Sequence, residues 1–371
     1  MPVTDRSIVD EMLEESRASI GQEVDRSRQR WNVHATSDAI RHFVWGIGDD
    51  NPLWLDEEYA NRSSVGCLTA PGTFLYSVDS TGIMPSGLEG LARLFAGSEW
   101  EWFDRVRAGD SFSADAKLTD VREVTGRKGG RMILKSTETT YWNQDGVKVA
   151  RSLGKSLCTE RVGAGGKLSY SPRSHEYSLD ELKNIQETVL GEVVRGAEPR
   201  LWDDTSPGEK MGPIVKGPLT LTDMICWYAG NGPHGRRPHR MAWKELFANP
   251  DFYYKSDSSG YEFSERGHYE AAMAGRLGMP GPYDNGLQRT SWLGHLVTDW
   301  MGDAGFLSKL TSRILLPNVF GDTTWITGEV SNRDEVDESS GSVEITIQAH
   351  NQLGELTASG TAQVVLPRAT K

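Results

Sequence analysis

The chain has 371 residues, of which 25% are charged and 37% hydrophobic, and its formal net charge is −12. These values are typical of a soluble globular protein with room for two domains of ordinary size. The acidic balance disfavours nucleic acid as a partner. No apolar run approaches the roughly 20 residues of a membrane span, so we expect no membrane association.

The start of the chain and the cysteines bear on the compartment. Residues 1–19 are acidic and lack an apolar signal core, so secretion is not expected. Cys67, Cys158 and Cys226 are odd in number and scattered, without metal-ligand spacing. We therefore expect a cytoplasmic protein without disulfides, and no metal site.

The first half predicts helices followed by strands. Apolar spacing and capping residues predict helices over 5–30 and 37–46, and a third that begins near Gly72. Alternating and β-branched residues then predict four strands separated by glycine-rich or Asn-Gln-Asp-Gly turns. These strands are 98–106, 111–124, 131–143 and 147–158.

The second half repeats this order after a break. Residues 162–215 are rich in turn residues and predict a connector with one helix at 179–190. Helices are then predicted over 221–229 and 286–300, with strands after Leu310. The irregular stretch 231–266 has no counterpart in the first half, and insertions of this length are often functional.

Short motifs recur in both halves at nearly one offset. Trp54 and His268 each lie 18 residues before a glycine, Gly72 and Gly286 respectively. Three further pairs follow the same register: Ala60 with Ala274, Arg62 with Arg276, and Asp110 with Asp322. The repeat predicts an α+β protein with two copies of one unit, residues 1–161 and 216–371, joined by a linker at 162–215.

One of these repeats carries a family motif. Gly48-Asp49-Asp50-Asn51-Pro52-Leu53-Trp54-Leu55-Asp56 resembles the signature of the MaoC-like (R)-specific enoyl-CoA hydratases and dehydratases, and Ala70-Pro71-Gly72 resembles the element that opens the family's central helix. The resemblance implies a tandem double-hotdog fold, each unit an antiparallel sheet wrapped around a central helix. It also implies an acyl-CoA hydratase/dehydratase that needs no cofactor and binds an acyl-CoA thioester, and we expect a homodimer or higher homo-oligomer.

In that family an aspartate and a histidine of the signature activate water, and the helix-opening glycine offers its N–H to the thioester oxygen. This chain departs from the pattern in both copies. Trp54 replaces the histidine, and indole cannot act as a base. In the second copy His268 is present, with Asn231 at the expected place of the aspartate. We therefore expect the first copy to shape the pocket and the second to carry the chemistry.

The expected catalytic residues are His268, Asp284, Gly286 and Asp49. His268 would act as acid or base with Asp284, and Gly286 would hold the thioester oxygen. Each has a structural alternative: a capping or surface role for His268, an N-cap for Asp284, a helix start for Gly286 and a turn for Asp49.

The expected substrate-binding residues are Asn231, His234, Arg236, Arg289 and Trp54. The loop 231–240 is basic, which suits the phosphates of coenzyme A, although a solvated loop is the alternative. Arg289 could instead form an ion pair. The tryptophan could wall an acyl pocket.

Two other functions stay open. A hotdog thioesterase would use a carboxylate such as Asp284 to activate water at the same thioester. A non-catalytic acyl-CoA-binding partner subunit would explain why neither copy has a complete signature.

Overall fold

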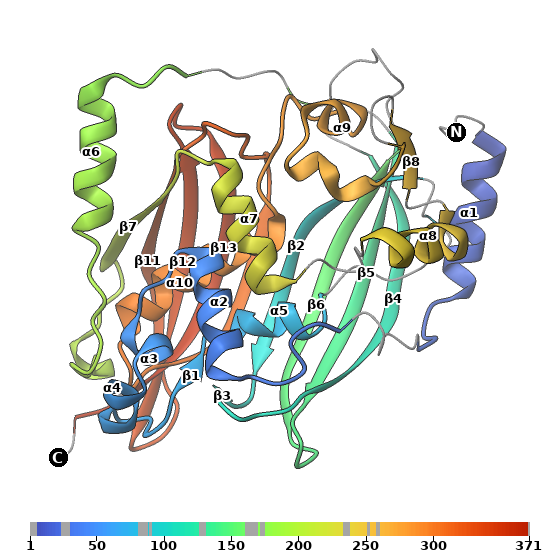
Figure 1. The fold of residues 1–371 in the computed structure, drawn as a ribbon. Coiled ribbons are helices and arrows are strands. Elements are labelled where there is room, and N and C mark those ends of the chain that lie inside the picture. Colours follow the sequence, from blue (N-terminus) through green and yellow to red (C-terminus); the bar gives the residue numbers. More distant parts are fainter. Residues whose placement is uncertain are drawn as a thin grey trace.

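The computed structural model describes residues 6–23, 30–80, 88, 91–125, 131–159, 170, 175–232, 238–250, 253–256 and 260–369. Helices pack on one face of a nine-stranded sheet (Figure 1). The strand order is β4-β5-β6-β2-β10-β13-β12-β11-β7. The strands of this sheet are β2 Ala92–Trp102, β4 Ser113–Thr125, β5 Arg131–Trp142, β6 Lys148–Thr159, β7 Lys210–Lys216, β10 Phe306–Ile314, β11 Thr324–Glu335, β12 Ser340–Asn351 and β13 Leu356–Pro367.

The sheet is built from two halves that meet at β2 and β10. These two strands pair antiparallel, from Gly97 with Arg313 to Glu101 with Lys309. The first half contributes four consecutive antiparallel strands and the second half five. This continuous double-hotdog arrangement confirms the α+β fold expected from the repeat.

The helices differ in length between the halves. The central helix of the second half, α10 (Gly286–Met301), is long, and all of its residues after Gly286 are buried. In the first half the corresponding position holds a single 3-10 turn, η2 (Gly72–Phe74), followed by the short α5 (Leu75–Val78). The other helical elements are α1 Arg6–Ala18, α2 Ser37–Ile47, α3 Pro52–Leu55, α4 Glu57–Arg62, α6 Leu179–Leu190, α7 Leu221–Asn231, α8 His239–Ala248, α9 Ala271–Arg276, η3 Trp202–Asp204 and η5 Ser264–His268.

The duplication is visible in matching hydrogen bonds around Asp110 and Asp322. In each copy the aspartate Oδ2 accepts from the backbone N–H three residues upstream, at 2.8 and 2.9 Å. Oδ1 accepts from the side-chain amide of Gln144 or Gln352. The same glutamine accepts from the backbone N–H that follows the aspartate, at 2.8 and 3.0 Å. Such a network, made twice, confirms that the two segments are equivalent.

The helices α2 and α7 cross at glycines. A Cβ on Gly46 would lie 2.9 Å from the carbonyl oxygen of Cys226, and a Cβ on Gly230 would overlap the carbonyl oxygen of His42. The two contacts are equivalent, because each glycine packs against the backbone of the other helix four residues before that helix's own glycine. This close crossing fixes the register of α7 against α2, and with it the position of the loop after α2.

Two segments differ from the expectation. Within the expected linker, β7 pairs with β11 as the edge strand of the sheet, so the sheet of the second half begins at Lys210. The insertion 231–266 contains regular structure among its described residues. It holds α8 and a small hairpin formed by β8 (Tyr253–Ser256) and β9 (Gly260–Phe263). The sequence pattern does not predict β7 or the β8–β9 hairpin, because these strands are short or partly exposed.

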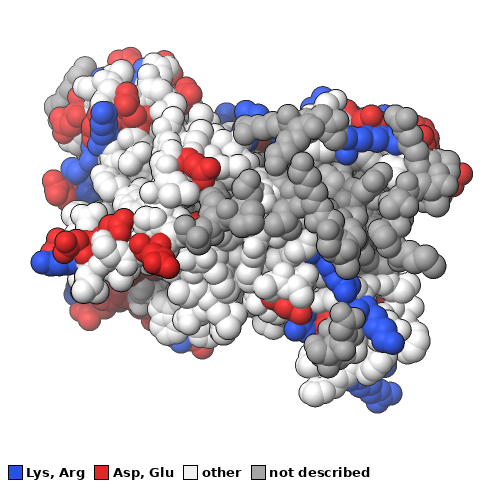
Figure 2. All heavy atoms as spheres, turned by 90° about the horizontal axis from the view of Figure 1, so that it is seen from above, with Lys and Arg blue, Asp and Glu red and all other residues white. Residues whose placement is uncertain are grey.

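No helix in the described part of the chain has the length and apolar character needed to cross a membrane. On the face drawn in Figure 2, charged side chains gather mainly toward the two ends, and much of the described surface between them is uncharged.

Candidate active site

The signature loop folds around the carboxylate of Asp49. Gly48 ends α2 in the left-handed conformation, with φ 62°, which turns the chain. Asp49 Oδ1 then accepts from the backbone N–H of Asn51 at 3.0 Å, and the Asn51 side chain caps α3 through Leu53. Asp49 Oδ2 accepts from the indole N–H of Trp54 at 3.1 Å. Both carboxylate oxygens are therefore oriented by the loop itself.

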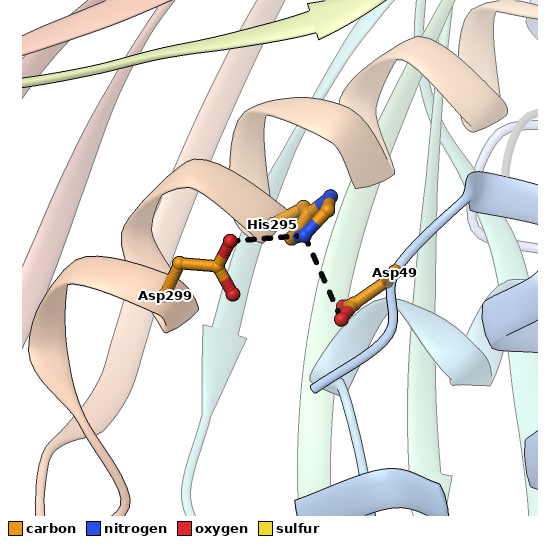
Figure 3. Close-up of side chains that lie close together, drawn as sticks. All are labelled: Asp49, His295 and Asp299. Atoms are coloured by element: carbon orange, nitrogen blue, oxygen red, sulfur yellow. Dashed lines mark ion pairs between the residues drawn. The ribbon is translucent and has the colours of Figure 1, made fainter. Parts of the chain in front are cut away.

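His295 approaches Asp49 from the other half of the chain. It lies in the middle of α10, and its Nε2 is 3.6 Å from Asp49 Oδ1. The same nitrogen is 3.1 Å from Oδ2 of Asp299, one helical turn further along α10 (Figure 3). The three side chains are almost completely buried. A carboxylate from the first half of the chain and an imidazole from the second half are thus brought together.

Burial sets the protonation of this cluster. It lowers the pKa of His295 to about 4, against partial compensation by the Asp49 charge, so the imidazole is neutral near pH 7. Burial raises the pKa of Asp299 to about 7 and also raises the pKa of Asp49. The pKa of Asp299 is thus displaced toward neutrality, so this carboxyl group can exchange a proton at physiological pH.

Lys216 supplies a positive charge beside the cluster. Its Nζ donates to the carbonyl oxygen of Gly48 at 2.6 Å. Its charge lowers the pKa of both Asp49 and Asp299, although burial is the larger effect on each. The imidazole and two carboxylates have ligand atoms within 4.8 Å of one another and are a donor set that could hold a divalent cation. Burial lowers the pKa of Lys216, against partial compensation by the charges of Glu192, Asp49 and Asp299.

A small cavity lies on the other side of Trp54. Its volume is about 30 Å³, and its lining includes Trp54, Gly72, Trp102 and Thr298. A cavity of this size holds water. Trp54 therefore lines the cavity and also contacts the Asp49 carboxylate, so that one indole ring links the two.

Asp49 and Trp54 are the expected residues that meet at this cluster. His268 lies instead on η5, the counterpart of α3. Its Nδ1 is 3.0 Å from the carbonyl oxygen of Tyr283, and its ring packs against those of Tyr228 and Tyr283. His268 therefore lies at the position that the repeat predicts, and its ring contacts tyrosine rings instead of Asp49.

Asp284 and Arg289 form a buried ion pair. Both guanidinium nitrogens Nε and Nη2 contact the carboxylate, with Nε to Oδ2 at 2.6 Å. Nη1 donates to the carbonyl oxygens of Leu316 and Thr357. The cap of α10 is Asn285, not Asp284. The expected catalytic carboxylate and substrate-binding cation are thus each other's partners, which points to a structural role for both.

The two helix-opening glycines lie under aromatic rings. A Cβ on Gly286 would clash with the ring of Phe95, and one on Gly72 would lie 2.5 Å from Nε1 of Trp102. Both rings belong to β2. A bulge between Phe95 and Gly97 shifts the register of that strand. The rings fill the space above each glycine.

The remaining expected binding residues lie in or beside the insertion. Asn231 is buried at the end of α7, where the glycine register makes it the counterpart of Ile47, not of Asp49. The counterpart of Asp49 falls at position 233. His234 and Arg236 also lie outside the described residues.

Sequence reasoning missed His295 and Asp299. Neither belongs to a motif, and both lie within a helix assigned to the core. The available signal was a histidine with an aspartate at i+4 on a helix that is otherwise apolar on every side, because buried ionisable groups require partners.

Comparison with known proteins gives the same fold. Residues 18–152 match the family model described as FAS1-like, dehydratase domain region. The chain is 29% identical over 131 residues to a probable enoyl-CoA hydratase alpha subunit from Thermomonospora curvata, covering 30% of this chain and 40% of that protein. It therefore spans less than half the length of this relative.

Solved structures resemble the whole chain. A MaoC-like dehydratase superposes with a TM-score of 0.65 at 16% identity, over 95% of this chain and 100% of the other. A Mycobacterium tuberculosis protein with a double hotdog fold superposes with a TM-score of 0.54 at 10% identity, over 94% and 96% of the two chains.

Proposed function

We propose that this double-hotdog chain is a dehydratase of the MaoC-like type, which adds water to, or removes water from, an α,β-unsaturated acyl-CoA thioester. The observation that carries the proposal is the contact between Asp49 and His295. Through this contact Asp49, the aspartate of the signature, has a histidine neighbour, although Trp54 occupies the position of the signature histidine. The hydratase subunit to which the chain is related supports the same chemistry.

The reaction needs one group that takes a proton from water and one that delivers a proton to the α-carbon. In the hydration direction, Asp49 or His295 takes the proton as the water oxygen bonds to the β-carbon. The electron pair of the double bond moves toward the thioester oxygen, and the α-carbon then takes up the proton that the base has received from water. Asp299, whose pKa of about 7 lets it hold or release a proton, orients His295 and exchanges the proton with it. We assign the cluster to proton transfer because Asp299, with a pKa of about 7, lies 3.1 Å from His295.

The substrate reaches this cluster past Trp54. The cavity lined by Trp54 and Gly72 is too small for an acyl thioester, so the indole has to shift on binding. Its hydrogen bond to Asp49 is of the kind that contributes about 1.5–3 kcal/mol when one partner is charged. A bound thioester can offset a cost of that size.

The first experiment incubates the protein with enoyl-CoA, 3-hydroxyacyl-CoA and saturated acyl-CoA thioesters. Water addition or removal, with no free thiol, is expected. Asp49→Asn keeps the acceptor for the Asn51 N–H but cannot take a proton, and it should lower kcat by 10²–10⁴-fold. Release of thiol from the saturated thioester would indicate a thioesterase and contradict the proposal.

A non-catalytic acyl-CoA-binding subunit is the second candidate, because the indole of Trp54 stands between the cavity and Asp49. The relative described as an alpha subunit is consistent with a partner chain. Trp54→His restores the family signature and separates the two ideas. If the wild-type chain binds thioesters without turnover and Trp54→His turns them over, the chain is a binding subunit whose site was closed by this one substitution.

A further inference from the structure

The indole N–H of Trp102 is a buried donor on a residue that lines a cavity. Trp102 ends β2 and is 3% exposed. Its Nε1 has no hydrogen-bond partner within the part of the chain that the structure describes. The ring lines the cavity beside Gly72, and a Cβ on that glycine would lie 2.5 Å from Nε1. The donor and the glycine backbone are therefore adjacent at one wall of the cavity.

The ring is held in place by other aromatic side chains. Trp102 stacks on Trp100 with 5.3 Å between centroids and 2° between planes. Trp100 stacks in turn on Tyr141 and meets Tyr76 edge-on. The stack restricts rotation of the Trp102 indole. Its N–H thus keeps a fixed direction beside Gly72, as a preorganised donor requires.

A buried donor without an acceptor is costly. The lost hydration of such a group is not repaid, and about 90% or more of buried polar groups in native proteins have a partner. A cavity of about 30 Å³ beside the donor can admit a water molecule or a ligand oxygen as the acceptor. The position of this unpaired donor on a residue of the cavity wall therefore favours an oxygen atom bound in the cavity as its acceptor.

We propose that the indole N–H of Trp102 donates a hydrogen bond to the thioester carbonyl oxygen of the acyl-CoA. This inference rests on the proposed function for the identity of the ligand. When water adds to the β-carbon, negative charge develops on the thioester oxygen before the α-carbon takes up its proton. Trp102 stabilises that charge and transfers no proton, because indole N–H is a donor only.

Trp102→Phe tests the donor, and Trp100→Phe is the matched control. Both changes remove an indole N–H from the same buried face of β2, but Trp100 does not line the cavity. Loss of one oxyanion donor lowers kcat by about 10²–10³-fold. We expect a loss of that order for Trp102→Phe on crotonyl-CoA, and a clearly smaller loss for Trp100→Phe. Equal losses in the two variants would overturn the proposal.

A second readout does not depend on turnover. The indole ¹⁵N–¹H resonance of Trp102, identified by its absence in Trp102→Phe, should move downfield when butyryl-CoA is added. An unchanged resonance under saturating butyryl-CoA overturns the donor role. If the resonance moves but no thioester is hydrated, the donor role stands and the hydratase proposal fails, so the two failures are distinguishable.

Discussion

The imidazole Nε2 of His295 lies 3.6 Å from Oδ1 of Asp49, although the two residues come from opposite halves of the chain. The signature loop supplies the carboxylate, and the central helix of the second copy supplies the imidazole. The substitution of the signature histidine by Trp54 therefore does not leave Asp49 without a histidine. Because both copies belong to one polypeptide, a histidine of the second copy can lie beside the aspartate of the first within a single molecule.

The crossing of α2 and α7 should depend on its glycines. Gly230→Ala would place a methyl group against the backbone of His42, which cannot move away as a side-chain end could. We expect a loss of about 1–3 kcal/mol in the free energy of unfolding, measured with urea. Gly275→Ala, on a helix where a methyl group meets nothing within 4 Å, is the control. Equal stability of the two variants would contradict the close crossing.

The Asp284–Arg289 pair should support the fold more than the chemistry. Asp284→Asn leaves a buried guanidinium without its charge partner, and breaking such a pair costs about 3–5 kcal/mol. We expect a lower melting temperature, with kcat per folded molecule close to that of the wild type. If turnover instead falls by orders of magnitude at unchanged stability, Asp284 belongs to the active site after all.

The raised pKa of Asp299 predicts a pH dependence of stability. Its pKa rises from 3.8 in the unfolded chain to about 7 in the folded one, so the folded state binds more protons between these values. This stabilising contribution is complete below pH 4 and is lost as the pH rises through about 7. A pKa change of one corresponds to about 1.36 kcal/mol, so the free energy of unfolding falls by an amount of the order of 4 kcal/mol.

The measurement is urea unfolding of the wild type and of Asp299→Asn between pH 4 and 8. The lowered pKa of His295 has the opposite sign, because its contribution grows as the pH rises from about 4 to 6.5. Both proteins contain His295, so its effect largely cancels in the difference. The wild type should lose stability relative to the variant as the pH rises. A difference that stays constant with pH would show that the Asp299 pKa is not raised.

The fold could be predicted because its evidence is local and repeated. The motifs around Gly72, Asp110 and Asn143 each recur in the second half, and every one of them marks a turn or a helix start. Such positions constrain residue type through backbone conformation. Their matching order was enough to predict two copies of one unit.

The site could not be predicted in the same way. His268 was favoured because it aligns with Trp54 in sequence, but pairing with Asp49 depends on contact between halves. That contact is set by how α10 lies against the loop after α2, through packing that no local motif encodes. Asp284 was favoured by its place before Gly286, and its ion pair with Arg289 is a property of the folded core.

We propose that His295 is the histidine of the active site. The most direct test is kcat/KM for hydration of crotonyl-CoA by His295→Gln and by His268→Gln, with folding checked by circular dichroism. Glutamine keeps polar contacts but cannot exchange a proton. We expect a loss of 10²–10⁴-fold for His295→Gln and a change of less than tenfold for His268→Gln. The reverse order, with His295→Gln near wild type and His268→Gln inactive, would place the chemistry in the second copy and contradict the claim.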